Sequence, residues 1–392
     1  MDIPSPHWSD RYCGGAWIVS SYREAAAALR DRRLTTARAG AWVNVSGPGA
    51  RGEFRALKAI LARTMLFTDG ARHRRLRSAA APAFGPAALG ALAPAVRAAV
   101  DELVDGVSAE AGVVDFIARF ARPLPVRVIA AMLGIPRADC AALVDWSDDV
   151  AVFIGEPTPT LESARRAQAG AEGIVAYFRG RLEWAPQDGG LAGLLSDAAR
   201  RGVMTQMDLL AQCGMFLFAG HETTRNLLGN ALLLFLQHPD AWTRLREGRA
   251  ALRPALREVL RMDSPVQYTG RRALHDLDIG GQRVRRGDLV IVDVAGANRD
   301  PSVFGEPDAF RIDRDDAPPL TFGWGPHLCI GAELSYLEAQ TAFEVLLRRL
   351  PHLRLAGTPL RQDNPVYRGL DSLPVAVGGA CEAPPGADLQ AA

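Results

Sequence analysis

The feature that most limits how this chain can fold is an unbroken helical pattern from Thr205 to about Gln237. The segment contains no proline and only isolated glycines, and His238-Pro239 marks its end. At 1.5 Å per residue, a helix of this length spans roughly 50 Å, enough to cross a whole domain. Its most apolar part, Leu209–Leu236, is interrupted by polar side chains and fails the test of about 18 uninterrupted apolar residues for a membrane span. We therefore expect a helix buried inside protein.

The remaining patterns predict a mainly α domain with a small β-sheet region. Helical patterns occupy residues 22–30, most of 86–195, 253–262 and 332–350. Strand patterns are confined to 17–19 and 266–294, and the Gly- and Pro-containing segment 40–52 is typical of a loop. No repeat or long linker divides the chain, so we expect a single domain over residues 1–392, with 378–392 as a flexible tail.

Composition excludes several classes of protein. Basic and acidic side chains number 45 and 44, so no global field favours nucleic acid or an anionic membrane surface. The five cysteines are odd in number and have no paired spacing, which indicates free thiols in a reducing compartment. The N-terminal residues lack the charged and apolar segments of a signal peptide. We expect a cytoplasmic monomer that binds neither nucleic acid nor membrane.

A lone cysteine, Cys329, lies in the glycine-rich stretch FGWGPHLCIG at 322–331. A cysteine binds a metal as its thiolate, which hydrogen-bond donors and the positive end of a helix stabilise. Gly323, Gly325 and Gly331 permit a tight loop whose N–H groups turn toward the sulfur, and a helical pattern begins just past it. No second Cys or His lies at zinc spacing. One protein ligand suits a porphyrin-bound iron, and a buried free cysteine in a turn is the plain alternative.

This stretch resembles the haem-binding loop of cytochrome P450, whose pattern is Phe-Gly-x-Gly-x-His-x-Cys-x-Gly, and every fixed position is present. The resemblance extends from about Trp17 to Val377. It implies the P450 fold, a triangular helical prism in which the long helix lies over haem on the distal side. It also implies haem b with Cys329 as the axial iron ligand, and further haem contacts from Phe322, Gly323, Gly325, His327 and Gly331.

The helical segment before the strands carries Glu258-Val259-Leu260-Arg261, which places an acid and a base on one helix face, where they can pair. Pairs at this spacing are also common on exposed helices. The resemblance implies that this pair supports the haem loop, with Arg314 as its third partner.

Ala219-Gly220-His221-Glu222-Thr223 interrupts the long apolar helix with polar groups, which are costly to bury unless they are satisfied. A kink with internally bonded threonines is one explanation. The resemblance implies that Ala219 and Gly220 open a groove for dioxygen and that Glu222 and Thr223 relay protons to it. We expect His221 to be a satisfied core histidine and not a ligand.

Haem propionates need cationic donors when they are buried. The resemblance implies His73 and Arg77, which form a His-x-x-x-Arg segment, together with Arg271 and His327.

These features imply, through the resemblance, a haem-thiolate monooxygenase that activates dioxygen with two electrons and two protons to oxidise a small organic substrate. No flavin-domain pattern occurs in residues 1–392, so we expect the electrons to come from a separate ferredoxin and its NAD(P)H-dependent reductase. Leu334-Ser335-Tyr336 stands where the family has Leu-Ala-Arg, which removes an arginine near the expected donor face.

Two other functions remain open: a haem-thiolate sensor without turnover, and a peroxide-driven oxygenase. The retained Glu222–Thr223 pair weighs against both, because a sensor needs no proton delivery and peroxide-driven members tend to replace the pair. The substrate is undetermined, although family habit favours secondary metabolism over fatty-acid oxidation. Polar side chains at Gln267, Tyr268 and Thr269 indicate a substrate with a polar handle. We expect the pocket lining to come from residues 41–59, 154–160, 209–219, 266–269 and 369–372.

Overall fold

The structure is a computed structural model that describes residues 6–12, 14–39, 48–110, 112–181 and 190–378. Most of the expected tail, 379–392, and residues 40–47 of the expected loop lie outside the described residues. The helices are α1 (Tyr22–Arg30), α3 (Pro48–Glu53), α4 (Arg55–Leu61), α5 (Gly70–Ala80), α6 (Pro86–Ala109), α7 (Pro123–Leu133), α8 (Cys140–Gly155), α9 (Leu161–Arg181), α10 (Leu191–Arg200), α11 (Gln206–Gln237), α12 (Pro239–Arg246), α13 (Leu252–Met262), α14 (Val294–Ala297) and α15 (Ala332–Arg349).

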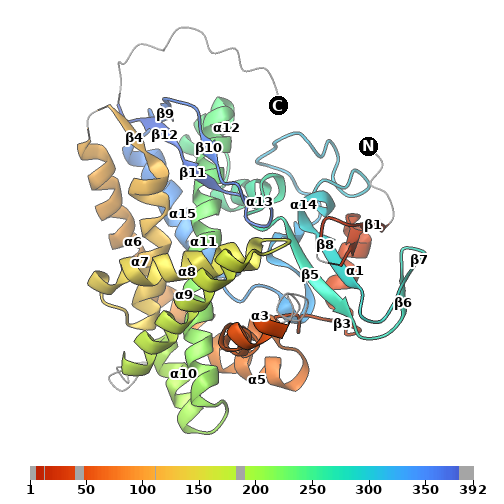
Figure 1. Cartoon of the computed structure of the whole chain (residues 1–392). Helices are drawn as coiled ribbons and strands as arrows, with labels where there is room; N and C mark the ends of the chain where they lie inside the picture. Colours follow the sequence, from red (N-terminus) through yellow and green to blue (C-terminus); the bar gives the residue numbers. More distant parts are fainter. Residues whose placement is uncertain (1–5, 13, 40–47, 111, 182–189, 379–392) are drawn as a thin grey trace.

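Helix α11 is the axis of the helical part, running through it from end to end, with α7, α8 and α9 packed against it (Figure 1). Its start is fixed by a capping box, in which Thr205 accepts from the Asp208 N–H while the Asp208 carboxylate accepts from the Thr205 N–H. Most of its residues are buried, including the polar Asp208, Gln212, His221, Glu222, Thr224, Arg225, Asn226 and Asn230. The expected helix buried inside protein is therefore confirmed, and its polar residues need partners.

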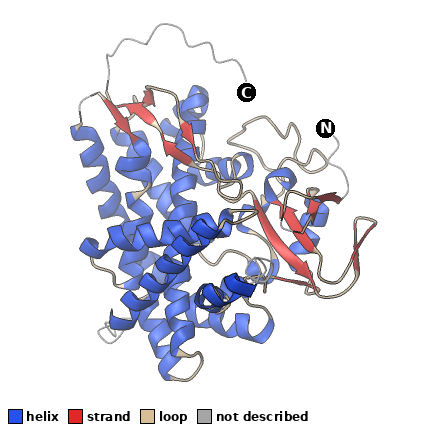
Figure 2. Cartoon of the chain, in the orientation of Figure 1, coloured by secondary structure: helices blue, strands red, loops and turns tan. Residues whose placement is uncertain are grey.

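The strands form small sheets at the margins of the helical part (Figure 2). Their bounds are β1 (His7–Ser9), β2 (Ala16–Val19), β3 (Leu34–Thr35), β4 (Val113–Asp115), β5 (Tyr268–Ala273), β6 (Leu277–Ile279), β7 (Gln282–Val284), β8 (Leu289–Asp293), β9 (Arg354–Leu355), β10 (Leu360–Arg361), β11 (Leu370–Ser372) and β12 (Pro374–Ala376). The largest sheet has the order β1-β2-β8-β5-β3, with β2 parallel to β8 and β5 antiparallel to it. It brings the N-terminal residues against the strand region expected at 266–294.

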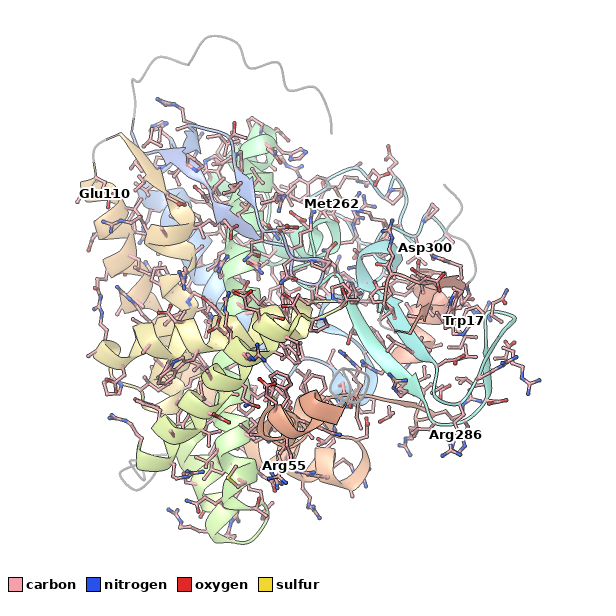
Figure 3. All side chains as sticks on the ribbon, in the orientation of Figure 1. Trp17, Arg55, Glu110, Met262, Arg286 and Asp300 are labelled. Atoms are coloured by element: carbon pink, nitrogen blue, oxygen red, sulfur yellow. The ribbon has the colours of Figure 1, made fainter. Side chains whose placement is uncertain are left out.

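A side-chain contact outside the sheet fastens the same two parts of the chain. The Asp300 carboxylate accepts from the Tyr22 N–H at 2.8 Å, which ties the start of α1 to the segment after α14. Figure 3 labels Asp300 and Trp17, which lie together in the smaller, sheet-bearing part of the molecule. The Trp17 Nε1 in turn donates to Asp288 Oδ2 at 3.1 Å.

One expected element is wrong in part. The loop expected over 40–52 is helical from Pro48 onward, where α3 begins. Proline is favoured at the first helical position because its missing N–H has no partner there anyway, so the Pro-Gly signal marked a helix start and not only a loop. The short strands β1, β3, β4 and β9–β12 were not expected, because two or three residues carry no readable alternation.

Within the described residues, no single helix is long and apolar enough to cross a membrane. One bent pair, Gly70–Phe84 followed by Pro86–Ala109 at 52°, meets the length and composition test together.

Candidate active site

Cys329 lies in the loop that leads into α15. Its N–H donates to the Phe322 carbonyl at 2.8 Å, which closes the loop on itself. Gly323 and Gly325 have φ angles of +73° and +74°, in the left-handed region that favours glycine. A Cβ on Gly325 would also lie 2.9 Å from Arg30 Cγ, so the loop can pack this closely on α1 only with glycine. These glycines therefore set the loop's shape.

The Cys329 sulfur faces a cavity and is accessible from it, although protein surrounds the side chain elsewhere. Burial raises the pKa of the Cys329 thiol, and the Gly331 N–H and the Arg77 guanidinium oppose part of this shift. A Cβ on Gly331 would meet the sulfur only at an ordinary contact distance of 4.0 Å. Both opposing groups stabilise the thiolate, the form in which cysteine binds a metal.

The expected support of this loop is a buried ionic triad. Arg261 donates two bonds to the Glu258 carboxylate, at 2.7 and 2.8 Å, and Arg314 Nε lies 3.1 Å from both oxygens of the same group. All three side chains are at most 4 % exposed. The sequence placed Glu258 and Arg261 on one helix, and the structure brings Arg314 to them from more than 50 residues away.

The triad is connected to the cysteine loop through Asn298. Arg261 Nη1 donates to the Asn298 carbonyl at 3.0 Å, and Asn298 Oδ1 accepts from the Leu320 N–H at 2.7 Å. The amide Nδ2 donates to Thr321 Oγ1 at 3.0 Å. Leu320 and Thr321 directly precede Phe322, whose carbonyl holds the Cys329 N–H. A continuous chain of bonds thus runs from α13 to the cysteine.

Two of the expected propionate donors meet ring to ring. The imidazoles of His73, on α5, and His327 have centroids 4.1 Å apart. His327 Nε2 lies 3.0 Å from Asp69 Oδ1, and Asp69 also accepts from the Thr35 hydroxyl and the Thr36 N–H. Burial alone would raise the pKa of Asp69, but the bonds with His327 and Thr35 outweigh it and hold that pKa well below its usual range. Burial, reinforced by His327, lowers the pKa of His73 to about 4.

The two expected arginines are enclosed and unpaired. Burial lowers the pKa of Arg77, against the opposing effect of Cys329, and lowers the pKa of Arg271 to about 10. Arg271 Nη1 donates to Thr269 Oγ1 at 3.0 Å and to the Gly270 carbonyl at 2.9 Å. Among the described residues, neither arginine forms an ion pair with a carboxylate. Enclosed cations without a partner carry a desolvation cost, so both are suited to an anionic ligand.

Across the cavity from the cysteine loop, α11 presents Ala219, Gly220, Thr223 and Thr224. Thr223 Oγ1 donates back to the Ala219 carbonyl at 3.3 Å, a bond that bends helices, so the internally bonded threonine is present. A Cβ on Gly220 would lie 2.9 Å from Ile129 Cδ1, so glycine at this position also lets α7 pack against α11.

Glu222 is buried and does not line the cavity. Its carboxylate accepts from Arg225 Nη1 at 3.3 Å and from Asn226 Nδ2 and Gln362 Nε2, both at 3.2 Å. Arg225 Nη2 also lies 3.6 Å from the carboxylate of Asp371, which is 52 % exposed. The acid therefore faces a polar route to the surface, and no hydrogen bond joins it to the neighbouring threonine in the described residues.

His221 is a satisfied core residue, as expected. Its Nδ1 lies 2.9 Å from the Leu217 carbonyl and its Nε2 lies 3.1 Å from Asp148 Oδ1. Each ring nitrogen therefore has a hydrogen-bond partner inside the protein. Asp148 also accepts from Arg122 Nη2 at 2.8 Å. Reactive atoms of Asp148, His221 and Glu222 lie within 4.8 Å of one another, but protein partners already engage each of them.

The cavity has a volume of about 370 Å³ and lies between α11 and the cysteine loop. Three of the five expected lining segments contribute, through Ile154, Glu156, Pro157, Met215, Phe216, Phe218, Ala219, Val266, Tyr268 and Thr269. The other two do not: the lining includes no described residue from 41–59, and it takes Val366 and Tyr367 where 369–372 was expected. Gln267 is also absent from the lining, because its Nε2 donates to the Ser264 carbonyl at 2.6 Å.

Several functional contacts were missed from the sequence. Asp69 gave no signal beyond its place ahead of His73, and no role was expected for Asn298. Ser335, in the place of the family's alanine, lies 3.3 Å from Thr224, hydroxyl to hydroxyl. Only the tertiary structure brings such a pair together.

These residues fit a haem. Among the described residues, Cys329 and His327 line the cavity, and the His73 ring lies against His327 with centroids 4.1 Å apart. Arg77 is close enough to act on the Cys329 thiol, and neither Arg77 nor Arg271 forms an ion pair with a carboxylate among these residues. A planar dianion coordinated at its centre by sulfur needs this set of donors.

Comparisons with known proteins agree with this fit. The model of the cytochrome P450 family matches residues 185–366. The biotin biosynthesis cytochrome P450 of Bacillus subtilis is 35% identical over 370 residues, which is 92% of this chain and 89% of that protein. The cytochrome P450 monooxygenase PikC of Streptomyces venezuelae is 36% identical over 92% of this chain and 84% of its own length. The crystal structure of P450BioI in complex with hexadec-9Z-enoic acid ligated acyl carrier protein superposes with a TM-score of 0.85 at 34% identity, covering 93% of this chain and 92% of that one.

Proposed function

Because this chain belongs to the cytochrome P450 family, and is a haem-thiolate monooxygenase that takes an organic substrate and needs redox partners, we propose specific roles for its residues. Cys329 is the axial ligand, and the group it holds is haem b. Bound there, haem supplies the activation of dioxygen, while the protein supplies placement and protons. The observation that carries this proposal is the Cys329 sulfur facing α11 across one cavity.

We assign the propionate contacts to His73, Arg77, Arg271 and His327. The two arginines have the fixed charge and donor geometry that carboxylates favour, and neither has a competing carboxylate partner among the described residues. His73 is neutral near pH 7 and offers an N–H, whereas His327 is already oriented by Asp69. The triad of Glu258, Arg261 and Arg314 holds the loop that carries the cysteine.

Proton delivery falls to Glu222 and Thr223, beside the groove of Ala219 and Gly220. Thr223 lines the cavity, and the Glu222 carboxylate lies on the side that leads through Arg225 to Asp371. The two side chains are not hydrogen bonded, so transfer requires that Glu222 turns from Arg225 or that a water bridges the gap.

We further propose a separate ferredoxin with an NAD(P)H-dependent reductase as electron source and a substrate from secondary metabolism. Relatives in biotin and polyketide biosynthesis support the latter. A single domain over 1–392, a monomeric state and a cytoplasmic location stay predictions.

The test is Cys329→Ser together with Thr223→Val in haem-loaded protein. The serine variant should lose the thiolate-type haem spectrum while keeping the fold, since the side chain faces a cavity. Thr223→Val should keep that spectrum but waste reducing equivalents, giving less product per NAD(P)H, with Thr223→Ser as the matched control. An unchanged spectrum in Cys329→Ser would refute the ligand assignment, and unchanged coupling in Thr223→Val would refute the relay.

A further inference from the structure

Arg38, between β3 and the undescribed segment 40–47, has no role in the proposed function although it borders the cavity. Its Nε donates to the Gly270 carbonyl at 3.1 Å, and its guanidinium carbon lies 5.4 Å from the centre of the Phe67 ring. A Cβ on Gly270 would lie 2.9 Å from Nε and 3.0 Å from the guanidinium carbon. The guanidinium of Arg38 therefore occupies the space that a side chain at Gly270, on β5, would fill.

No negative charge in the described part of the chain compensates the Arg38 cation at this position. Among the described residues, Arg38 forms no ion pair, and its terminal nitrogens have no hydrogen-bond partner. Burial lowers the pKa of Arg38, and the groups that interact with it electrostatically include Tyr367, Tyr268 and the cations Arg271 and Arg272, none of which is an acid that ionises at neutral pH. Arginine stays charged in such surroundings. A charge enclosed without a partner is costly, which makes it a candidate for binding a ligand.

The surroundings add neutral donors to this charge. Tyr12, Tyr268 and Tyr367 line the same cavity, and burial raises the pKa of each, so all three keep their phenolic protons. Glu156, the one carboxylate in the lining, is already engaged by the Ser163 hydroxyl at 2.5 Å. Much of the remaining lining is apolar, including Met215, Phe216, Phe218, Leu227 and Val366. The cavity therefore combines an apolar wall with a region that favours an anion.

We propose that Arg38 binds a carboxylate of the substrate, so that the protein selects amphiphilic organic acids over their neutral esters. This inference rests on the proposed function, because it concerns a substrate of the same site. A guanidinium binds a carboxylate through two parallel N–H bonds, and the terminal nitrogens of Arg38, which have no partner among the described residues, provide this pair. The acid's apolar body then packs on the phenylalanines of α11. A haem propionate is the other source of the same chemistry, and the experiment separates the two.

The experiment is a spectral titration of the haem-loaded ferric protein with matched acid and methyl ester pairs of decanoic, dodecanoic and 4-phenylbutanoic acid. Variants are Arg38→Gln, Arg38→Lys and, as a control for net charge, Arg32→Gln, whose side chain is exposed on the same segment. For the acids, we expect Arg38→Gln to raise Kd about 10- to 100-fold, which corresponds to about 1.5–3 kcal/mol for a bond to a charged group.

The esters should change by less than about threefold, Arg38→Lys should recover part of the acid affinity, and Arg32→Gln should match the wild type. Equal loss of acid and ester affinity, or faster transfer of haem to a haem-scavenging protein with an unchanged acid-to-ester ratio, would assign Arg38 to a propionate and overturn the proposal. Wild-type protein that prefers the ester in every pair, or responds to none, would overturn it too. Failure of the proposed function is distinct, because the wild type would then show no thiolate-type haem spectrum at all.

Discussion

The clearest quantitative prediction concerns Arg261→Met in the buried triad. Arg261 is 1 % exposed and makes five hydrogen bonds: two to Glu258 and one each to the carbonyls of Asn298, Pro307 and Ala309. Methionine fills a similar volume but donates to none of these acceptors. The variant therefore removes a cation and leaves its acceptors behind in a dry site.

Two of the four partners, Glu258 and Ala309, keep other donors. Glu258 retains Arg314 Nε and the Arg311 N–H, and Ala309 O retains Arg314 Nη2. The carbonyls of Asn298 and Pro307 are left without this donor, at about 1 kcal/mol or more each. With the loss of the two charge-assisted bonds to Glu258 added, the free energy of unfolding should fall by about 3–5 kcal/mol. This is the range for breaking a buried ion pair by removing one partner.

The assay is urea unfolding of haem-loaded protein followed by far-UV circular dichroism, with the haem spectrum read in parallel. Arg253→Met is the matched control on the same helix, because its pair with Glu333 is exposed and should be worth about 1 kcal/mol or less. We expect Arg261→Met also to weaken the thiolate-type spectrum, since the triad is linked to the cysteine loop through Asn298. Equal, small losses in both variants would refute this reasoning.

Two further predictions concern histidines. His221→Leu should destabilise the protein by about 1–3 kcal/mol, because Asp148 would keep only Arg122 as a partner; an unchanged urea midpoint would contradict a stabilising role for the His221 bonds. In haem-free protein, the pKa of His73 is lower in the folded state than in the unfolded chain, so the unfolded chain binds this proton first as the pH falls. The contribution of His73 to the free energy of unfolding is therefore complete above about pH 6.5 and is lost as the pH falls toward about 4. His73→Gln should flatten the stability–pH curve in that window, and a curve parallel to the wild type would show that His73 does not titrate in this way.

Local signals in the sequence located the reactive elements well. The bounds of α11 and α13 differ from the expected ones by one residue, since Thr205 caps the start of α11 and a proline follows the end of each helix. The glycines of the cysteine loop predicted its tight turns, because residues other than glycine are strained at the positive φ angles found there. The motif residues Cys329, His73 and His327 could be picked out, and the structure brings them to one cavity region.

Side-chain directions were less predictable. Glu222 and Thr223 are neighbours in sequence, but they point to different environments because successive helical residues are about 100° apart. Gln267 turned out of the cavity because the nearby Ser264 carbonyl offered it a bond. Pairings such as Thr224 with Ser335 have no sequence signature, since each partner is an ordinary hydroxyl.

By itself, the sequence determined most of the helices and the glycine-shaped loop around Cys329, because these depend on residues that are close along the chain. The tertiary structure alone decided that Asn298 links the triad to the cysteine loop, that Asp69 orients His327 and that Arg38 has no carboxylate partner among the described residues. Each of these arrangements depends on segments that are distant in sequence and lie together in an interior of low dielectric constant. The energy of a charge there depends on which partners the fold supplies, and no local pattern records that.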